Sequence, residues 1–292
     1  MCVNDRTEDD KEHSERVRRM IKVDRQLMLL VLALVLCLSI VAVSAVSSIP
    51  MAAGNFGSHL ESQDIPALNY HKVDNYHHAL SIPPGEFEEQ IKYLHDNGYH
   101  SINPDDLVAN IKYGNALPDK PILITFDDGY ADNYSNAYPI LKKYNFTATI
   151  FIITNMVGKD PRFVTWEQVR EMQESGFVFA SHTVNHLPLT NLPADQIENE
   201  LVQSRDEITQ QLGVTPKYFA YPTGAYNLQI EDIVRKAGYT AAFTIRYGQD
   251  GPKSDLYALE RIPIFKSQQT FRSFFIRLNG APLLERFGAI RN

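Results

Sequence analysis

The stretch Ile122–Tyr130, ILITFDDGY, runs from an apolar segment straight into two adjacent aspartates and a glycine. The apolar part predicts a buried strand over Ile122–Phe126. Adjacent carboxylates at the end of a buried strand, here Asp127 and Asp128, are costly to remove from water unless a positive group neutralises them. The pair therefore marks either a charged functional site or a turn, because Asp-Gly also favours turns.

Similar β-prone segments alternate with amphipathic helical patterns along the chain, which is typical of an α/β fold with a largely parallel sheet. Seven strands with helices between them favour a barrel over an open sheet. The other six expected strands are Ala67–Tyr70, Ala148–Ile153, Val178–Ser181, Tyr218–Tyr221, Ala241–Ile245 and Glu260–Ile264. The expected helices follow Pro84, follow a Thr165 N-cap, and span Ala194–Leu212 and Leu228–Ala237.

Polar residues follow several of these strands. His71 follows the first strand, His182 follows Val178–Ser181, and Pro222 to Gly224 follow Tyr218–Tyr221. Because the carboxyl ends of parallel strands share one face, these residues and the aspartate pair are expected to meet there. The sequence thus predicts an active site at that face.

His182 and His186 lie four residues apart in SHTVNH, so a helical turn would place both rings on one side. Two imidazoles and one carboxylate bind a divalent cation and leave positions open for water and substrate, whereas an isolated pair is more often structural. Zinc is the expected ion, and cobalt, nickel and iron accept the same donors. A second carboxylate would then take a proton from acidified water, which suits ester or amide hydrolysis.

Three motifs together resemble the polysaccharide deacetylase family, the carbohydrate esterases with a nodulation-type deacetylase domain: Thr125–Gly129 (TFDDG), Ser181–His186 (SHTVNH) and Phe219–Gly224 (FAYPTG). The resemblance covers most of residues 65–265 and is strongest to the extracellular poly-N-acetylglucosamine deacetylases of biofilm formation, through ALNYHKV, FEEQIKYLHDNGYHSINPDDL and the FAYP form of the third motif. It implies a distorted, incomplete (β/α)7 barrel.

The resemblance also implies roles for individual residues. Asp127 would be the general base. The metal would be held by Asp128, His182 and His186. The backbone N–H of Thr223, after Pro222, would help to stabilise the oxyanion of the tetrahedral intermediate.

The sequence departs from the family pattern in two places, so two catalytic roles are expected to fall to other residues. The arginine usual in the third motif is missing, and Arg261 in LERIPI is the expected replacement beside Asp127, with a surface ion pair as its alternative. No histidine follows His186, so the general acid is expected at His71 in NYHKV, unless that residue is a buried structural histidine. His77 and His78 are weaker candidates for the acid.

Two tyrosines next to the motifs, Tyr130 and Tyr221, are candidates to line a sugar groove, because aromatic rings stack on pyranose faces. The substrate expected from the resemblance is an extracellular polysaccharide of N-acetylglucosamine. Peptidoglycan or chitin oligomers are the alternative substrates. A non-catalytic glycan-binding relative is the alternative function.

The residues at the amino end predict on which side of the membrane the deacetylase domain lies. Residues 27–46, LMLLVLALVLCLSIVAVSAV, carry no charge, and as a helix they would span about 30 Å, the thickness of a bilayer core. Basic residues precede this segment and none follows before Lys72, so residues 1–26 are expected in the cytoplasm. A linker over 47–64 and a deacetylase domain over 65–292 would lie outside the cell. A cleaved signal peptide, which would release the domain, is the alternative.

Composition excludes several classes of protein. Lys and Arg total 28 against 35 Asp and Glu, a balance opposite to that of a nucleic-acid-binding protein, so no nucleic-acid partner is expected. Both cysteines, Cys2 and Cys37, lie near the amino end. The predicted domain therefore contains no disulfide framework, cysteine-based zinc site or cysteine nucleophile.

Overall fold

The computed structural model describes residues 64–76, 78–264 and 271–286. The predicted cytoplasmic tail, the predicted anchor and nearly all of the predicted linker lie outside these residues, as does His77. Within the described ranges, no helix combines the length and the apolar character that crossing a membrane requires.

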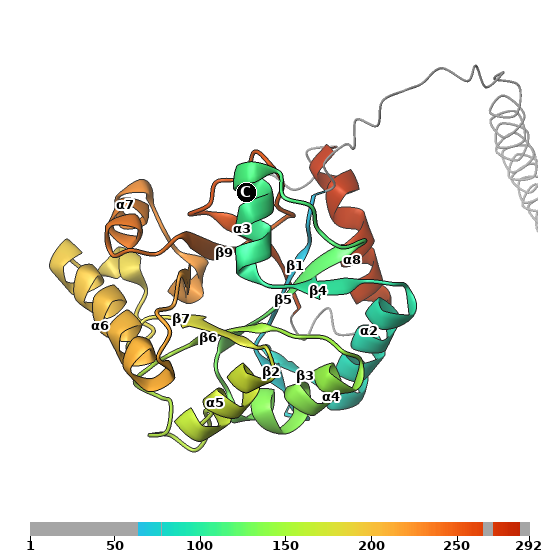
Figure 1. Ribbon diagram of the computed structural model, residues 1–292, viewed down its shortest axis with the longest axis horizontal. Coiled ribbons are helices and arrows are strands. Elements are labelled where there is room, and N and C mark those ends of the chain that lie inside the picture. The colour runs from blue at the N-terminus through green and yellow to red at the C-terminus, as the bar shows by residue number, and fades with distance from the viewer. Residues whose placement is uncertain (1–63, 77, 265–270, 287–292) are drawn as a thin grey trace, which may run out of the picture. The chain divides into compact units, whose positions relative to one another are not determined.

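Seven parallel strands form a closed ring in the order β1-β10-β9-β8-β7-β6-β5, and β5 returns to β1 (Figure 1). Leu68 in β1 closes the ring, because it pairs with Ile262 on one side and Ile124 on the other. The predicted seven-stranded α/β barrel is confirmed, with all seven strands within a few residues of their expected bounds. They are β1 (Ala67–Tyr70), β5 (Pro121–Asp128), β6 (Thr149–Ile152), β7 (Val178–Ser181), β8 (Tyr218–Ala220), β9 (Ala241–Tyr247) and β10 (Leu259–Pro263).

The ring is distorted where β9 meets β10, because the register shifts between Leu259 and Arg261. Three short strands were not predicted. β4 (His100–Ile102) pairs with the first residues of β5, while β2 (Lys72–Val73) and β3 (Ser81–Ile82) pair only with each other. Segments of two or three residues are too short for alternation of apolar and polar residues to reveal them.

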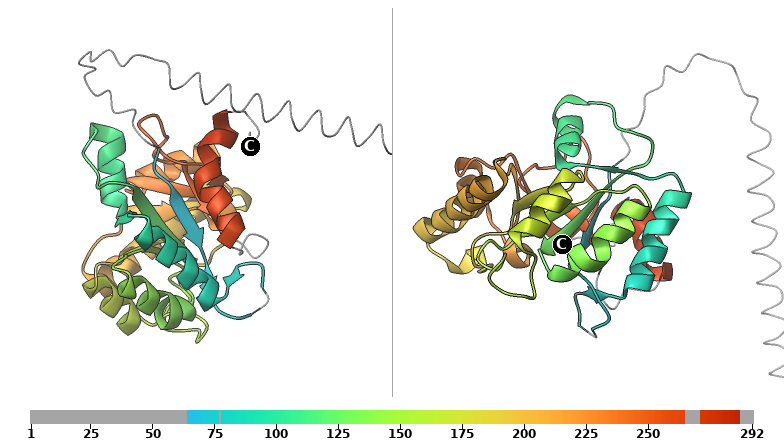
Figure 2. Two further views of the ribbon diagram at one scale, coloured as in Figure 1. Left: turned by 90° about the vertical axis from the view of Figure 1, so that its right-hand side faces the viewer. Right: turned by 60° about the horizontal axis from the view of Figure 1, so that its bottom comes forward.

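Helices surround the ring in all three views (Figures 1 and 2). The predicted ones are α2 (Pro84–Asp96), α5 (Trp166–Glu174), α6 (Ala194–Leu212) and α7 (Leu228–Lys236). The Thr165 cap of α5 is confirmed as a capping box with Gln168, and α6 ends at left-handed Gly213. The remaining helices of the described residues were not predicted: α3 (Pro104–Tyr113), α4 (Tyr138–Lys143), α8 (Phe271–Arg286), the short π-helix η1 (Asn133–Ala137) and the 3-10 helices η2 (Leu189–Asn191) and η3 (Pro222–Gly224).

Successive residues of each strand face opposite sides of the barrel wall. Leu68, Tyr70 and Phe126 belong to the core between the strands and the helices outside them. Ala67 and Leu123 belong to a second core that also holds β-strand residues from around the ring. Further along the same two strands, the inner side carries buried polar residues, such as Asn69 in β1 and Asp127 in β5. The functional side chains therefore lie at the carboxyl ends of the strands.

Candidate active site

Asp127 and Arg261 form a buried, two-pronged ion pair at the carboxyl end of the barrel. Arg261 Nη1 lies 2.7 Å from Asp127 Oδ1 and Nη2 lies 2.8 Å from Oδ2. Arg261 has no exposed surface, and its Nε donates to the Thr244 carbonyl oxygen at 2.7 Å. The arginine predicted to stand beside Asp127 is therefore there, supplied by β10 instead of the third motif.

Asn69 is a second partner of this carboxylate, and it was not predicted from the sequence. Its Nδ2 donates to Asp127 Oδ2 at 3.0 Å. Burial alone would raise the pKa of Asp127, but the positive charge of Arg261 and its hydrogen bonds to the carboxylate hold that pKa well below its usual range. Asp127 is thus ionised at neutral pH. Asn69 lies two residues before His71, so strand alternation was the signal that could have found it.

Asp128, His182 and His186 converge beside Asp127. Their donor atoms all lie within 4.8 Å of one another, and Asp128 Oδ1 is 3.5 Å from His182 Nε2 and 3.4 Å from His186 Nε2. His182 Nδ1 donates to the Ala220 carbonyl oxygen at 2.7 Å, which leaves its Nε2 as the free lone pair. Asp128 Oδ1 is buried without a hydrogen-bond partner. These features fit a divalent cation bound by one carboxylate and two imidazoles.

The protonation of the three groups is set chiefly by burial. Burial and the neighbouring Asp127 carboxylate raise the pKa of Asp128 to about 7, against a smaller opposing effect of Tyr130. Burial also lowers the pKa of His182 to about 3, so this imidazole is neutral and able to ligate. A bound cation would offset the cost of ionising Asp128, because it stabilises the carboxylate form.

The segment from His182 to His186 is not helical, which corrects the expectation of a helical turn. Thr183 and His186 both have left-handed backbone conformations, with φ of 68° and 57°. The rings nevertheless face each other, with centroids 4.7 Å apart. The spacing of four residues brings the two imidazoles together through a tight loop after β7.

His71 follows β1 and faces the same carboxylate. Its Nε2 lies 4.0 Å from Asp127 Oδ2, and its side chain is 11% exposed. Burial lowers the pKa of His71 to about 4, and the Asp127 charge opposes this only in part. The structure therefore brings together Asp127, Arg261, His71 and the three candidate metal ligands, while His78 is exposed in the loop before β3.

The sequence around this site is similar to that of known proteins. Residues 114–242 match the family model described as polysaccharide deacetylase. YxkH of Bacillus subtilis (strain 168), which is assigned to the polysaccharide deacetylases, is 36% identical over 200 residues, which cover 68% of this chain and 71% of that protein. The chain belongs to the polysaccharide deacetylase family. A deacetylase is a hydrolase, so the family places this chain among the hydrolases. The chain also carries a candidate metal site of one aspartate and two histidines.

Two further relatives extend the comparison. The poly-beta-1,6-N-acetyl-D-glucosamine N-deacetylase of Staphylococcus aureus (strain MSSA476) is 29% identical over 242 residues, covering 73% of this chain and 82% of that protein. The structure of the Streptococcus pyogenes deacetylase PplD in complex with acetate superposes with a TM-score of 0.71 at 29% identity, covering 75% of this chain and 99% of that one.

The third motif of this deacetylase follows β8 as a short 3-10 helix, η3 (Pro222–Gly224). Thr223 is exposed there with a left-handed φ of 61°, three residues after Ala220, whose carbonyl holds His182. Thr223 and Pro222 therefore follow closely on the strand whose Ala220 carbonyl holds His182. The oxyanion role of the Thr223 N–H stays a prediction.

Tyr221 does not line a sugar groove, which corrects the prediction made for it. Its side chain is fully buried, and its hydroxyl donates to the Tyr257 carbonyl oxygen at 2.9 Å. The cause is strand alternation: Phe219 and Tyr221 face the core shared with α6 and α7, whereas Ala220 faces the barrel interior.

Tyr130 is partly exposed beside the candidate metal ligands. Its ring stacks on Phe163 with centroids 4.9 Å apart, and Lys72 Nζ lies 5.0 Å from the ring centroid. Its hydroxyl hydrogen-bonds the Asp128 carboxylate. This contact orients a candidate metal ligand, a role that the sequence analysis did not assign; the groove role stays a prediction.

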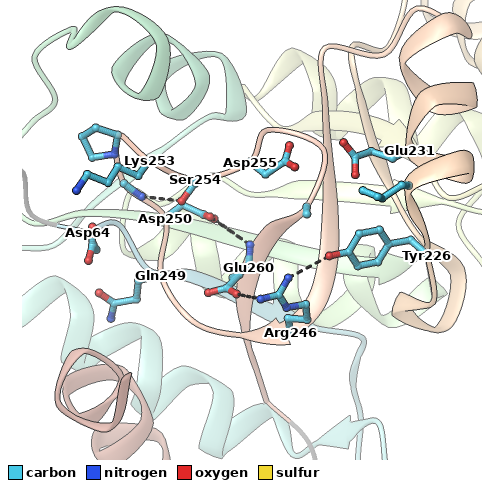
Figure 3. A pocket seen from close by; sticks show the side chains of 14 residues that line it. Asp64, Tyr226, Glu231, Arg246, Gln249, Asp250, Lys253, Ser254, Asp255 and Glu260 are labelled. Atoms are coloured by element: carbon cyan, nitrogen blue, oxygen red, sulfur yellow. Dashed lines mark hydrogen bonds and ion pairs between the residues drawn. The ribbon is translucent and has the colours of Figure 1, made fainter. Parts of the chain in front are cut away.

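A pocket of about 650 Å³ lies away from these residues, between α7 and the connection from β9 to β10 (Figure 3). Part of its polar lining is internally paired (Figure 3). Arg246 contacts both Tyr226 and Glu260, and the Asp250 carboxylate accepts from the Glu260 N–H. None of the predicted site residues lines it.

Proposed function

We propose that this protein is a metal-dependent N-deacetylase that removes acetyl groups from N-acetylglucosamine units of an extracellular polysaccharide of the poly-N-acetylglucosamine type and releases acetate. The observation that carries the proposal is the convergence of Asp128, His182 and His186 within 4.8 Å of one another, beside the ionised Asp127. The name of the Staphylococcus aureus relative supports this substrate class.

The residues of the site would share the hydrolysis of one amide bond. Asp128, His182 and His186 would hold a divalent cation, preferably zinc, with cobalt, nickel or iron as alternatives. When bound, the cation supplies Lewis-acid chemistry, because it polarises the acetamide carbonyl and makes water more acidic. The Thr223 N–H would donate to the oxygen that becomes negative as water adds to the carbonyl carbon.

Two side chains would move the protons. Asp127 would accept a proton from the attacking water, with Arg261 and Asn69 holding its carboxylate in place. Because burial keeps the His71 imidazole neutral at pH 7, His71 would receive the proton that Asp127 takes from water and pass it to the nitrogen as the C–N bond breaks, so that acetate and a free amine leave. His71 Nε2 lies 4.0 Å from Asp127 Oδ2, so the two proton-transferring side chains are neighbours at the same end of the barrel.

Acetate release tests this function. We expect the full-length protein in detergent to release acetate from poly-β-1,6-N-acetylglucosamine oligomers, faster with added Zn²⁺ and not after chelation. Asp127→Asn should lower the rate about 10²–10⁴-fold, the usual contribution of a general base, with its folding checked by circular dichroism.

Substrate screening separates the alternatives. Release only from peptidoglycan or chitin oligomers would replace the proposed polymer. Glycan binding with no metal-stimulated release from any acetylated glycan would contradict the enzyme and favour a binding protein. The buried Asp127–Arg261 pair supports the enzyme, because it supplies the arginine that the third motif lacks.

A further inference from the structure

A buried carboxylate on α6 holds the loop that carries both histidines. Glu200 Oε2 accepts from the backbone N–H groups of Val184 and Asn185, each at 2.9 Å. Glu200 Oε1 accepts from Asn185 Nδ2 at 2.6 Å. Glu200 is only 8% exposed, and it lies outside the three family motifs.

The conformation that these bonds hold is an unfavourable one. Thr183 and His186 are both left-handed, which non-glycine residues adopt only where their surroundings enforce it. Inside the loop, the His186 N–H donates to Thr183 Oγ1 at 2.9 Å. Below the loop, Ser181 Oγ accepts from the Thr183 N–H and lies 2.8 Å from Ser204 Oγ, one turn after Glu200 on α6.

The opposite side of the loop is also fixed. The carbonyl oxygens of Thr183 and Val184 accept from the backbone N–H groups of Thr154 and Asn155. Asn155 Nδ2 also donates to Asn185 Oδ1 at 3.0 Å. The segment after β6 therefore binds the loop's carbonyls, and Glu200 binds its N–H groups.

We propose that Glu200 is a positioning residue for the metal site, holding the loop so that His182 and His186 face Asp128 before an ion binds. The inference deepens the proposed function and rests on it through the metal site. Removing the carboxylate leaves the N–H groups of Val184 and Asn185 without their acceptor, and the left-handed residues then relax. The two imidazoles must be brought together again each time an ion binds, so affinity falls.

Zinc affinity of the full-length protein in detergent, measured by competition with a chelating dye, tests the proposal. We expect Glu200→Ala to weaken zinc binding about 10–100-fold, the usual loss when a partner outside the ligand set is removed. Glu198→Ala is the matched control, because Glu198 is exposed on the same helix, and it should bind like the wild type.

A compensating pair separates positioning from general stabilisation. Glu200→Gln keeps an acceptor for the two backbone N–H groups but sets an amide against Asn185 Nδ2, so it should also weaken zinc binding. Adding Asn185→Asp restores that hydrogen bond in reverse and keeps the net charge of the two residues, so the double variant should recover most of the affinity. This pair still tests the proposal if Glu200→Ala does not fold.

Two results would overturn the proposal: wild-type zinc affinity in Glu200→Gln, or no recovery in the double variant. Neither depends on acetate release. A wild-type protein that binds zinc but releases no acetate would instead contradict the proposed function.

Discussion

At the scale of single residues, Asp127 shows how its neighbours decide its chemistry. Its carboxylate is almost fully buried, yet Arg261 and Asn69 keep it charged and oriented. Asp128, next in the chain, faces the two histidines and has a raised pKa. Two adjacent carboxylates thus occupy opposite electrostatic environments, which suits one for accepting a proton and the other for ligation.

Arg261→Met should destabilise the protein by about 3–5 kcal/mol, because it leaves the Asp127 charge buried without its partner. Urea denaturation measures this. Arg261→Met combined with Asp127→Asn should be more stable than Arg261→Met alone, since the uncompensated charge is gone. Equal stability of the two variants would mean that charge pairing is not the cause.

His71→Asn tests the proton donor through the leaving group. Amide hydrolysis should fall about 10²–10⁴-fold, because the departing nitrogen needs a proton. Hydrolysis of an aryl acetate should fall much less, since a phenolate leaves without one. Asp127→Asn is the contrast and should slow both substrates. An equal loss of both activities in His71→Asn would argue that His71 is structural.

At the scale of elements, the loops that follow the strands carry the strain. Six non-glycine residues in the described ranges have positive φ, and four of them lie in the site, at the end of β5 or in the loops after β7 and β8: Asp128, Thr183, His186 and Thr223. Each turns the chain sharply where a strand ends, so that a side chain or a backbone group faces the site. Such conformations persist only where packing and hydrogen bonds enforce them.

The connection from β9 to β10 contains a pH-sensitive group. Asp250 is 1% exposed and accepts from the Glu260 N–H, and burial raises its pKa from 3.8 to about 7 (Figure 3). Because the folded protein binds this proton more tightly than the unfolded chain, the contribution to stability is complete at low pH and is lost as pH rises through 7.

Asp250→Asn should remove this pH dependence and keep an acceptor for the Glu260 N–H. Between pH 6 and pH 8, the wild type should lose about 1.4 kcal/mol relative to the variant, because over these two pH units the folded protein holds on average about half a proton more than the unfolded chain. Urea denaturation at both pH values measures the difference. A constant difference would mean that Asp250 is already ionised at pH 6.

At the scale of the whole molecule, closure of the barrel assembles the site. β1 and β10 lie near opposite ends of the domain sequence and pair directly with each other, and β1 also pairs with β5. Asn69, Asp127 and Arg261 meet because these three strands are neighbours. Three distant segments therefore build one ion pair and its hydrogen bonds.

Zinc should stabilise the whole protein, because it binds the folded site and not the unfolded chain. At a concentration 100 times Kd the gain is about 2.7 kcal/mol, equivalent to a rise of roughly 5–10 °C in Tm for a domain of this size. Differential scanning fluorimetry measures the rise, and a chelator should reverse it. His182→Ala should abolish it; the same rise in that variant would place zinc elsewhere.

Residues 27–46 should anchor the chain in the membrane with the deacetylase domain outside the cell, as their uncharged length and the preceding basic residues predict. We expect the protein to sediment with membranes, to resist alkaline extraction and to be open to protease from outside. A shortened form in the medium that lacks residues 1–46 would instead identify a cleaved signal peptide.

The sequence by itself determined the seven strands, the helix caps and the residues at the strand ends, because alternation, capping and adjacent charges are local patterns. Alternation along β1 places Asn69 on the same side as His71, but the sequence could not show that Asn69 contacts Asp127 or that Glu200 contacts the His182–His186 loop. Nor could it show which way Tyr221 faces. Only the tertiary structure decided these points, since hydrogen bonds between distant segments and the direction of a side chain depend on closure of the ring.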